Sequence, residues 1–174
     1  MWRKEGVRIE RGGGTIRVLG IDPGSQVTGY GVVEKERNGL CQVLQGEIRP
    51  GRGAALTSCL ETVYDGLREV IRQSQPDALS IENIFFGKNV KSLIRQGHVR
   101  GAAILAGKHC GTPVYEYSPL EIKQAVVGYG RAEKGQVQTM VKAILRLVEL
   151  PPPDAADALA VAICHIHFMK SDSV

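Results

Sequence analysis

The spacing of apolar residues changes along the chain and predicts strands first and helices later. Apolar runs over residues 16–22, 28–34 and 40–48 are typical of strands, and the Pro23-Gly24 turn between the first two brings the chain back on itself. These three strands therefore predict an antiparallel meander. From residue 56 the apolar spacing becomes helical, and one helix face collects Leu56, Leu60, Val63, Leu67, Val70 and Ile71.

Strands and helices alternate through the rest of the chain. Residues 78–82 predict a short strand that is parallel to the earlier ones because a helix precedes it, and residues 113–117 predict a fifth strand. Ser118-Pro-Leu-Glu121 is a capping box with proline at the first helical position, so a helix begins there. Further helices are predicted across 137–148 and from the prolines at 151–153 to about Met169. Another follows Asn89, with an apolar stripe of Val90, Leu93, Ile94, Ile104 and Leu105.

This order of elements predicts an α/β fold with a five-stranded mixed sheet, three antiparallel strands and then parallel strands, flanked by helices. A chain of 174 residues suggests one domain, which we expect over 15–170. The charged segment 1–14 ends in three glycines and is expected to be a flexible N-terminal extension, and 171–174 a C-terminal tail. The sequence contains no apolar run of the roughly 18 residues that a membrane span needs. Four scattered cysteines without a Cys-x-x-Cys pair favour reduced thiols in a cytoplasmic protein.

Charge is unevenly distributed along the chain. The net charge is +4, but residues 81–148 carry ten basic groups against four acidic ones, whereas residues 149–174 carry one against four. A run of basic residues is as often an ordinary solvent-exposed surface as a surface that binds a partner. A basic surface around an acidic site is nevertheless what an enzyme acting on a polyanion needs.

Four carboxylates adjoin sequence that is typical of buried core. Asp22 and Glu82 each end an apolar strand, and Asp154 and Asp157 lie three residues apart on one face of an alanine-rich helix. Two such charges about 5 Å apart repel by about 3 kcal/mol at an effective dielectric of about 20. Several together require a cation, and a hard cation with oxygen ligands suits Asp and Glu.

Three of these acids also have a purely structural interpretation, whereas a glutamate that ends an apolar strand, as Glu82 does, rarely has one. Asp22-Pro-Gly is an ordinary turn sequence, and Asp154 and Asp157 follow three prolines where acids favourably meet a helix dipole. Taken singly, both interpretations outweigh catalysis, and only the four acids together favour it. His165 and His167 are two residues apart on a helix and face different ways, so they are expected to be packing or surface residues rather than ligands.

Four segments resemble one family in order and register. They are residues 20–31 (GIDPGSQVTGYG), 81–89 (IENIFFGKN), 126–134 (VVGYGRAEK) and 154–160 (DAADALA). They are similar to RuvC, the bacterial Holliday junction resolvases, over about residues 16–168. The resemblance implies a ribonuclease H-like fold and a homodimer that cuts four-way junction DNA with magnesium in recombination and repair. It also implies partner motor proteins that drive branch migration. The extension 1–14 departs from the family pattern.

The resemblance also assigns roles to single residues. It implies that Asp22 bridges two Mg²⁺ ions, for which Mn²⁺ can substitute, with Glu82 on one side and Asp154 and Asp157 on the other. Phe85 matches the residue that stacks on unpaired bases at the junction centre, although an aromatic after a strand is as often core. Lys123 and Lys134 match basic residues set against the DNA backbone.

Gly97 and Gly101 lie on or beside the apolar stripe that follows Asn89, and a close helix neighbour would explain them. That neighbour is either the second subunit of the homodimer or another helix of the same chain. Two other functions fit the sequence less well. A sugar kinase or actin-like ATPase needs a second similar domain, which 174 residues cannot hold, and a non-catalytic junction-binding module would not need four carboxylates.

Overall fold

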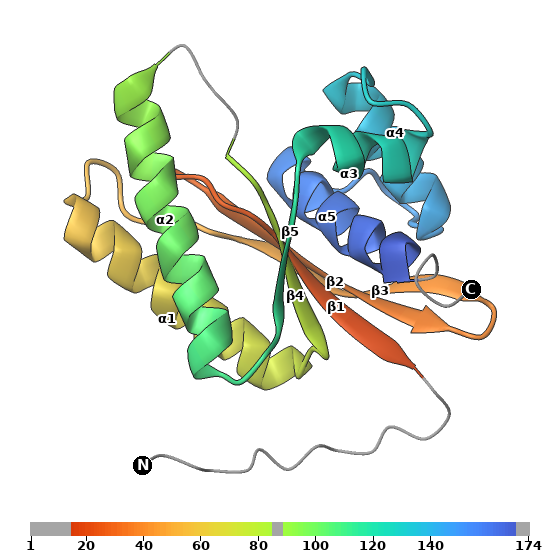
Figure 1. The fold of residues 1–174 in the computed structure, drawn as a ribbon, viewed down its shortest axis with the longest axis horizontal. Helices are drawn as coiled ribbons and strands as arrows, with labels where there is room; N and C mark the ends of the chain where they lie inside the picture. Colours follow the sequence, from red (N-terminus) through yellow and green to blue (C-terminus); the bar gives the residue numbers. More distant parts are fainter. Residues whose placement is uncertain (1–14, 85–88, 170–174) are drawn as a thin grey trace.

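The computed structural model describes residues 15–84 and 89–169 and has a mixed sheet with helices on both faces (Figure 1). The strand order is β3-β2-β1-β4-β5. The first three strands pair antiparallel, and β4 and β5 extend the sheet in parallel from β1, as predicted. The elements are β1 (Ile16–Asp22), β2 (Thr28–Glu36), β3 (Gly39–Ile48), α1 (Leu56–Ser74), β4 (Ala78–Glu82), α2 (Val90–His109), β5 (Val114–Tyr117), α3 (Pro119–Val127), α4 (Lys134–Ile144) and α5 (Pro153–Met169).

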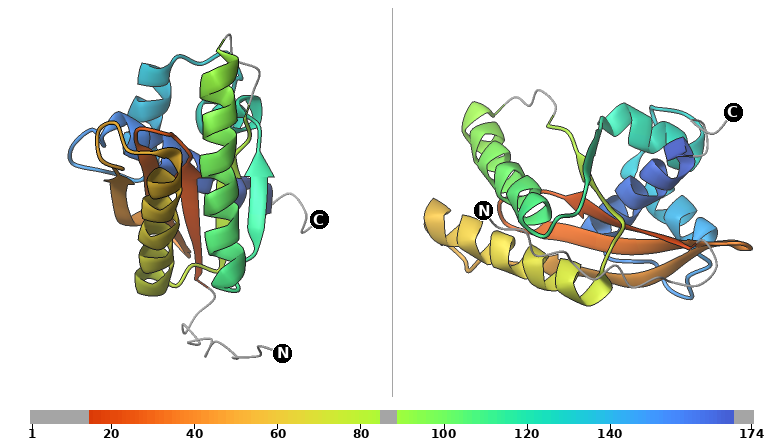
Figure 2. Two further views of the ribbon diagram at one scale, coloured as in Figure 1. Left: turned by 90° about the vertical axis from the view of Figure 1, so that its left-hand side faces the viewer. Right: turned by 60° about the horizontal axis from the view of Figure 1, so that its bottom comes forward.

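The sheet separates two hydrophobic cores. Helices α1 and α2 lie side by side over one face, and α5, with α3 and α4 beside it, covers the other (Figures 1 and 2). Leu19 and Ile21 of β1 pack toward α1 and α2, whereas Val18 packs toward α5. Residues 18, 20 and 22 of β1 therefore face α5, because side chains alternate along a strand.

The same alternation holds in β4. Leu79 and Ile81 point toward α1 and α2. The Ser80 hydroxyl instead donates a 3.2 Å hydrogen bond to the carbonyl of Val161 on α5. Glu82, two residues on, thus faces α5 as Asp22 does.

Helix α5 lies unusually close to the sheet because β1 and β2 present glycines to it. A Cβ added at Gly20 would be 2.0 Å from the carbonyl oxygen of Ala158 and 2.6 Å from the backbone nitrogen of Ala162. One added at Gly29 would be 2.0 Å from the carbonyl oxygen of Asp154. The alanines of α5 were expected to allow a close approach to the sheet, and the glycines complete that contact.

Two details of the predicted helices are wrong. The buried face of α2 consists of Val99, Ala103 and Ala106, while Ile94 and Leu105 of the predicted apolar stripe are 56% and 47% exposed. Small side chains form the contact because α2 packs closely on its neighbours, so the largest apolar residues do not mark the buried side. Helix α4 ends at Ile144 rather than Val148, since Arg146 adopts a positive φ of 53° that interrupts the helix.

Other predictions concern termini and compartment. The segments 1–14 and 171–174 and the candidate Phe85 lie outside the described residues. All four cysteines are free thiols, as expected. Among the helices described, none combines the length and apolar character required to cross a bilayer.

Candidate active site

Two of the predicted acids meet at the end of the central strand pair. Strands β1 and β4 run parallel, and their last paired residues are Ile21 and Ile81. Asp22 and Glu82 follow directly, on neighbouring strands and on the same face of the sheet. Sequence positions sixty residues apart are thus brought together by one parallel pairing.

Helix α5 brings the other two acids to the same place. Its first turns lie against Gly29 and Gly20, so Asp154 and Asp157 are held over the ends of β1 and β4. All four carboxylates line one pocket of about 450 Å³. Lys123 of α3 and Lys134 of α4 also line it, so the acids and lysines of the site come from five separate elements.

The pocket disfavours negative charge on its central acid. Burial, followed by the negative charges of Glu82 and Asp157, raises the pKa of Asp22 from 3.8 to about 7. Burial and Asp157 also raise the pKa of Glu82, and the positive charge of Lys134 opposes both shifts. The cluster is therefore electrostatically strained when its carboxylates are ionised.

Lysines supply part of the missing positive charge. The Lys134 ammonium donates to a carboxylate oxygen of Asp157 at 3.1 Å, and this bond raises the pKa of Lys134. The charge of Lys123 lowers the pKa of Glu82. Lys134 is 82% exposed, whereas Asp157 is 24% exposed, so the ammonium lies at the mouth of the pocket and the acid inside it.

These shifts predict an unusual pH dependence of stability in the metal-free protein. Between about pH 4 and pH 7 the folded protein keeps a proton on Asp22 that the unfolded chain has released, so the free energy of unfolding falls as pH rises through that range. Above pH 7, ionised Asp22 therefore lowers the free energy of unfolding by up to about 4 kcal/mol. Urea denaturation with a chelator should therefore show that Asp22→Asn stabilises the protein at pH 8 but has little effect at pH 4. An equal effect at both pH values would contradict the shift.

The side chains present fit a hard divalent cation. The pocket offers only oxygen donors from its acids, their burial is unfavourable without positive charge, and no histidine or cysteine lines the pocket. No three of the four carboxylates place oxygens all within 4.8 Å of one another.

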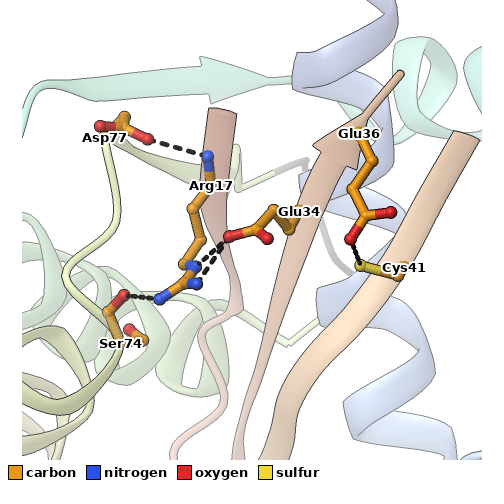
Figure 3. Close-up of polar contacts among 6 residues, drawn as sticks. All are labelled: Arg17, Glu34, Glu36, Cys41, Ser74 and Asp77. Atoms are coloured by element: carbon orange, nitrogen blue, oxygen red, sulfur yellow. Dashed lines mark hydrogen bonds and ion pairs between the residues drawn. The ribbon is translucent and has the colours of Figure 1, made fainter. Parts of the chain in front are cut away.

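A tighter group of potential ligands lies elsewhere and has a structural explanation. Within the described residues, Glu34, Glu36 and Cys41 bring ligand atoms within 4.8 Å at the opposite end of β2 (Figure 3). Glu34 pairs with Arg17 at 2.6 Å, and burial raises the pKa of the Cys41 thiol, which disfavours the thiolate that would bind a metal.

The other hydrogen-bond donors of Arg17 connect neighbouring elements at this end of the sheet. Its guanidinium donates to the carbonyl of Ser74 at 2.6 Å, and its backbone N–H donates to the carboxylate of Asp77 at 2.9 Å (Figure 3). The group therefore connects β1 to β2, to the end of α1 and to the start of β4.

The histidines behave as predicted. His165 is 3% exposed and bonds the Tyr117 hydroxyl at 2.7 Å, and His167 contacts the carbonyl of Ala125 at 3.0 Å. Neither lines the acidic pocket. Gln96 of α2 does line it and was not anticipated, since nothing in its local sequence distinguishes it from an ordinary surface glutamine.

Comparisons with known proteins agree with this geometry. The family model described as crossover junction endodeoxyribonuclease RuvC matches residues 18–165. The protein of that name from Geotalea uraniireducens is 52% identical over 150 residues, which are 86% of this chain and 88% of that protein. The one from Caldanaerobacter subterraneus is 53% identical over 153 residues, covering 87% and 93% respectively.

A solved structure extends the match to three dimensions. T. thermophilus RuvC in complex with Holliday junction substrate superposes with a TM-score of 0.85 at 32% identity, covering 91% of this chain and 97% of that chain. This match confirms the predicted ribonuclease H-like fold. With half of its residues shared with curated relatives along nearly their whole length, the chain belongs to the RuvC family of crossover junction endodeoxyribonucleases.

Proposed function

We propose that Asp22, Glu82, Asp154 and Asp157 are the catalytic acids with which this endonuclease resolves four-way DNA junctions, and that they hold two Mg²⁺ ions. One observation carries the proposal: acids from three distant segments line a single pocket with two lysines. A junction-bound relative of the same fold supports four-way DNA as the substrate. A buried acidic cluster without catalytic function would only lower the free energy of unfolding.

The residues of the pocket have different roles in this proposal. Two Mg²⁺ ions would activate the attacking water and neutralise charge at the scissile phosphate. Asp22, whose charge interacts with Glu82 and with both acids of α5, would act as the central ligand. Lys134, fixed by Asp157 at the mouth, and Lys123 present ammonium groups to the DNA backbone. Phe85 as the stacking residue at the junction centre stays a prediction.

A cleavage assay tests this function most directly. A synthetic four-way junction and a linear duplex of matching sequence are incubated with Mg²⁺, with Mn²⁺ or with a chelator. We expect symmetric cuts in two opposed strands of the junction, only with a divalent cation, and an intact duplex. Tight junction binding without cleavage under any of these conditions would instead favour the non-catalytic junction-binding module.

We further propose that the protein acts as a homodimer through α2. Ile94, His98, Gly101 and Leu105 repeat at spacings of four, three and four, so they share one face of the helix, and all four are exposed. A Cβ added at Gly101 would meet no atom of the described residues within 4 Å, so packing among them does not explain this glycine. A second copy of the helix, related by a two-fold axis, would cover this face and present two active sites to a nearly two-fold junction.

Charge placed on that face should break the dimer. Leu105→Asp should raise the dimer dissociation constant about 5- to 150-fold, since an unpartnered buried polar group costs about 1–3 kcal/mol. Sedimentation over a concentration series measures the change. Leu150→Asp is the matched control, because Leu150 is similarly exposed, at 52%, and lies outside α2. A dimer unaffected by Leu105→Asp, or disrupted equally by Leu150→Asp, would refute this interface.

Cytoplasmic location and branch-migration motor proteins as partners stay predictions from the sequence and its resemblance.

A further inference from the structure

A second hollow adjoins the catalytic pocket. It has a volume of about 1030 Å³ and is formed by the connection between β3 and α1, the start of α2 and the turn after β1. The turn joins the two hollows: Pro23 and Gly24 line the catalytic pocket, Ser25 and Gln26 line the second hollow, and Val27 lines both. The two are therefore neighbouring parts of one surface.

Among the described residues, all charged side chains of this hollow are positive. Four basic residues line it and no acidic one does, and we call it the basic groove, defined by Arg49, Arg52, Lys91 and Arg95. Arg49 forms an ion pair with Glu47, so part of its charge is compensated. Arg52 and Lys91 are exposed and have no acidic partner within the described residues. An uncompensated cluster of this kind attracts a polyanion.

Arg95 gives the groove a fixed shape. Its guanidinium donates a 3.1 Å hydrogen bond to the carbonyl of Ala54, which joins α2 to the connection that carries Arg49 and Arg52. The acceptor is neutral, so Arg95 keeps its full positive charge. The basic residues thus belong to two segments that are held together before any ligand binds, which lowers the entropic cost of binding.

Helix α2 leads from the groove to the catalytic acids. Lys91, Ser92 and Arg95 line the groove, and the next residue, Gln96, lines the catalytic pocket. A chain of phosphates can therefore lie in the groove and continue over the turn into the acidic site. Neutral polar groups and two glycines, Gly51 and Gly53, make up much of the remaining wall, so a backbone can approach closely.

We propose that the basic groove binds successive phosphates of the strand that enters the catalytic pocket, and so fixes which phosphate reaches the acids. The inference rests on the proposed function, because it takes junction DNA as the ligand. It adds a positioning site made by Arg52, Lys91 and Arg95, separate from the lysines at the pocket mouth.

The salt dependence of junction binding tests the groove. Binding of a synthetic four-way junction is measured with a chelator present, so that no cleavage occurs, across a series of salt concentrations. Each phosphate contact contributes about −0.9 to the slope of log affinity against log salt. Arg52→Ala and Lys91→Ala should each reduce the magnitude of that slope by up to about one. Arg37→Ala is the matched control, because Arg37 is exposed in the turn at the opposite end of β2 and should leave the slope unchanged.

A second measurement locates the contact. Single phosphates of the cleaved strand are replaced by neutral methylphosphonates, one position at a time. At the contacted position the replacement should weaken binding of the parent but not of Arg52→Ala, whereas Arg37→Ala should respond as the parent does. The cut site in the parent should also become less uniform with Arg52→Ala.

The outcomes separate the two proposals. If the parent cleaves junctions while Arg52→Ala and Lys91→Ala keep the parental slope and every methylphosphonate effect, the groove does not bind DNA and this inference alone fails. If the parent neither binds nor cleaves junctions, the proposed function fails. The inference that the groove binds junction DNA then fails as well. Slopes lowered equally in Arg37→Ala would mean a general effect of net charge and would also overturn the groove.

Discussion

Asp22→Asn should reduce junction cleavage at least about a thousandfold, which corresponds to about 4 kcal/mol of transition-state stabilisation. The pKa of Asp22 is raised by burial, by Glu82 and by both acids of α5, so Asp22 is the acid we propose as the central metal ligand, and an amide is a poorer ligand without charge. Junction binding should stay near the parental value, since the lysines and the basic groove are untouched. Single-turnover cleavage and binding in a chelator measure the two properties separately.

The controls exploit other carboxylates of the chain. Glu82→Gln should behave like Asp22→Asn, because both acids end neighbouring strands in the same pocket. Glu36→Gln, at the opposite end of the sheet, should cleave at the parental rate. Cleavage by Asp22→Asn within tenfold of the parent, at saturating magnesium, would remove Asp22 from the catalytic set.

Gly20→Ala should destabilise the protein by about 3 kcal/mol or more, although it adds a single methyl group. Its Cβ would lie 2.0 Å from the Ala158 carbonyl oxygen and 2.6 Å from the Ala162 nitrogen. These atoms belong to the backbone of α5, so no side-chain rotation relieves the overlap, and the whole helix must move. Denaturation in urea gives the loss of stability.

Gly135→Ala provides the comparison. Gly135 lies in α4, and a Cβ there would meet nothing within 4 Å, so alanine should stabilise the helix by about 0.5–1 kcal/mol. Any Gly20→Ala protein that folds should also cleave slowly, because movement of α5 shifts Asp154 and Asp157 away from the sheet. A Gly20→Ala variant as stable as the parent would mean that the helix is not held as closely as described.

Local pattern carried most of the information about the sheet and the acids. The alternation of side chains in β1 and the parallel pairing of β4 place Asp22 and Glu82 together, and both follow from short apolar runs that are visible in the sequence. The capping box at Ser118 and the alanine-rich helix with Asp154 and Asp157 are equally local signals.

Features set by distant packing were not visible in the same way. The buried face of α2 depends on how closely it approaches its neighbours, and Ile94 and Leu105 of the predicted stripe point outward. Arg49 and Arg52 belong to residues 15–80, whose net charge is −1. The net charge of sequence segments therefore gave no sign that they lie beside Lys91 and Arg95 in the fold. Gln96 reaches the catalytic pocket only because α2 passes over the end of β4.

The backbone-on-backbone contact at Gly20 and Gly29 has a consequence for substitution of the acids themselves. At these two positions no side chain separates helix and sheet, so repacking there cannot alter their separation. An aspartate of the pocket lengthened by one methylene, as in Asp157→Glu, therefore has no compensating adjustment of the helix available and must displace its own carboxylate. The length of each acidic side chain is therefore as important to the site as its charge.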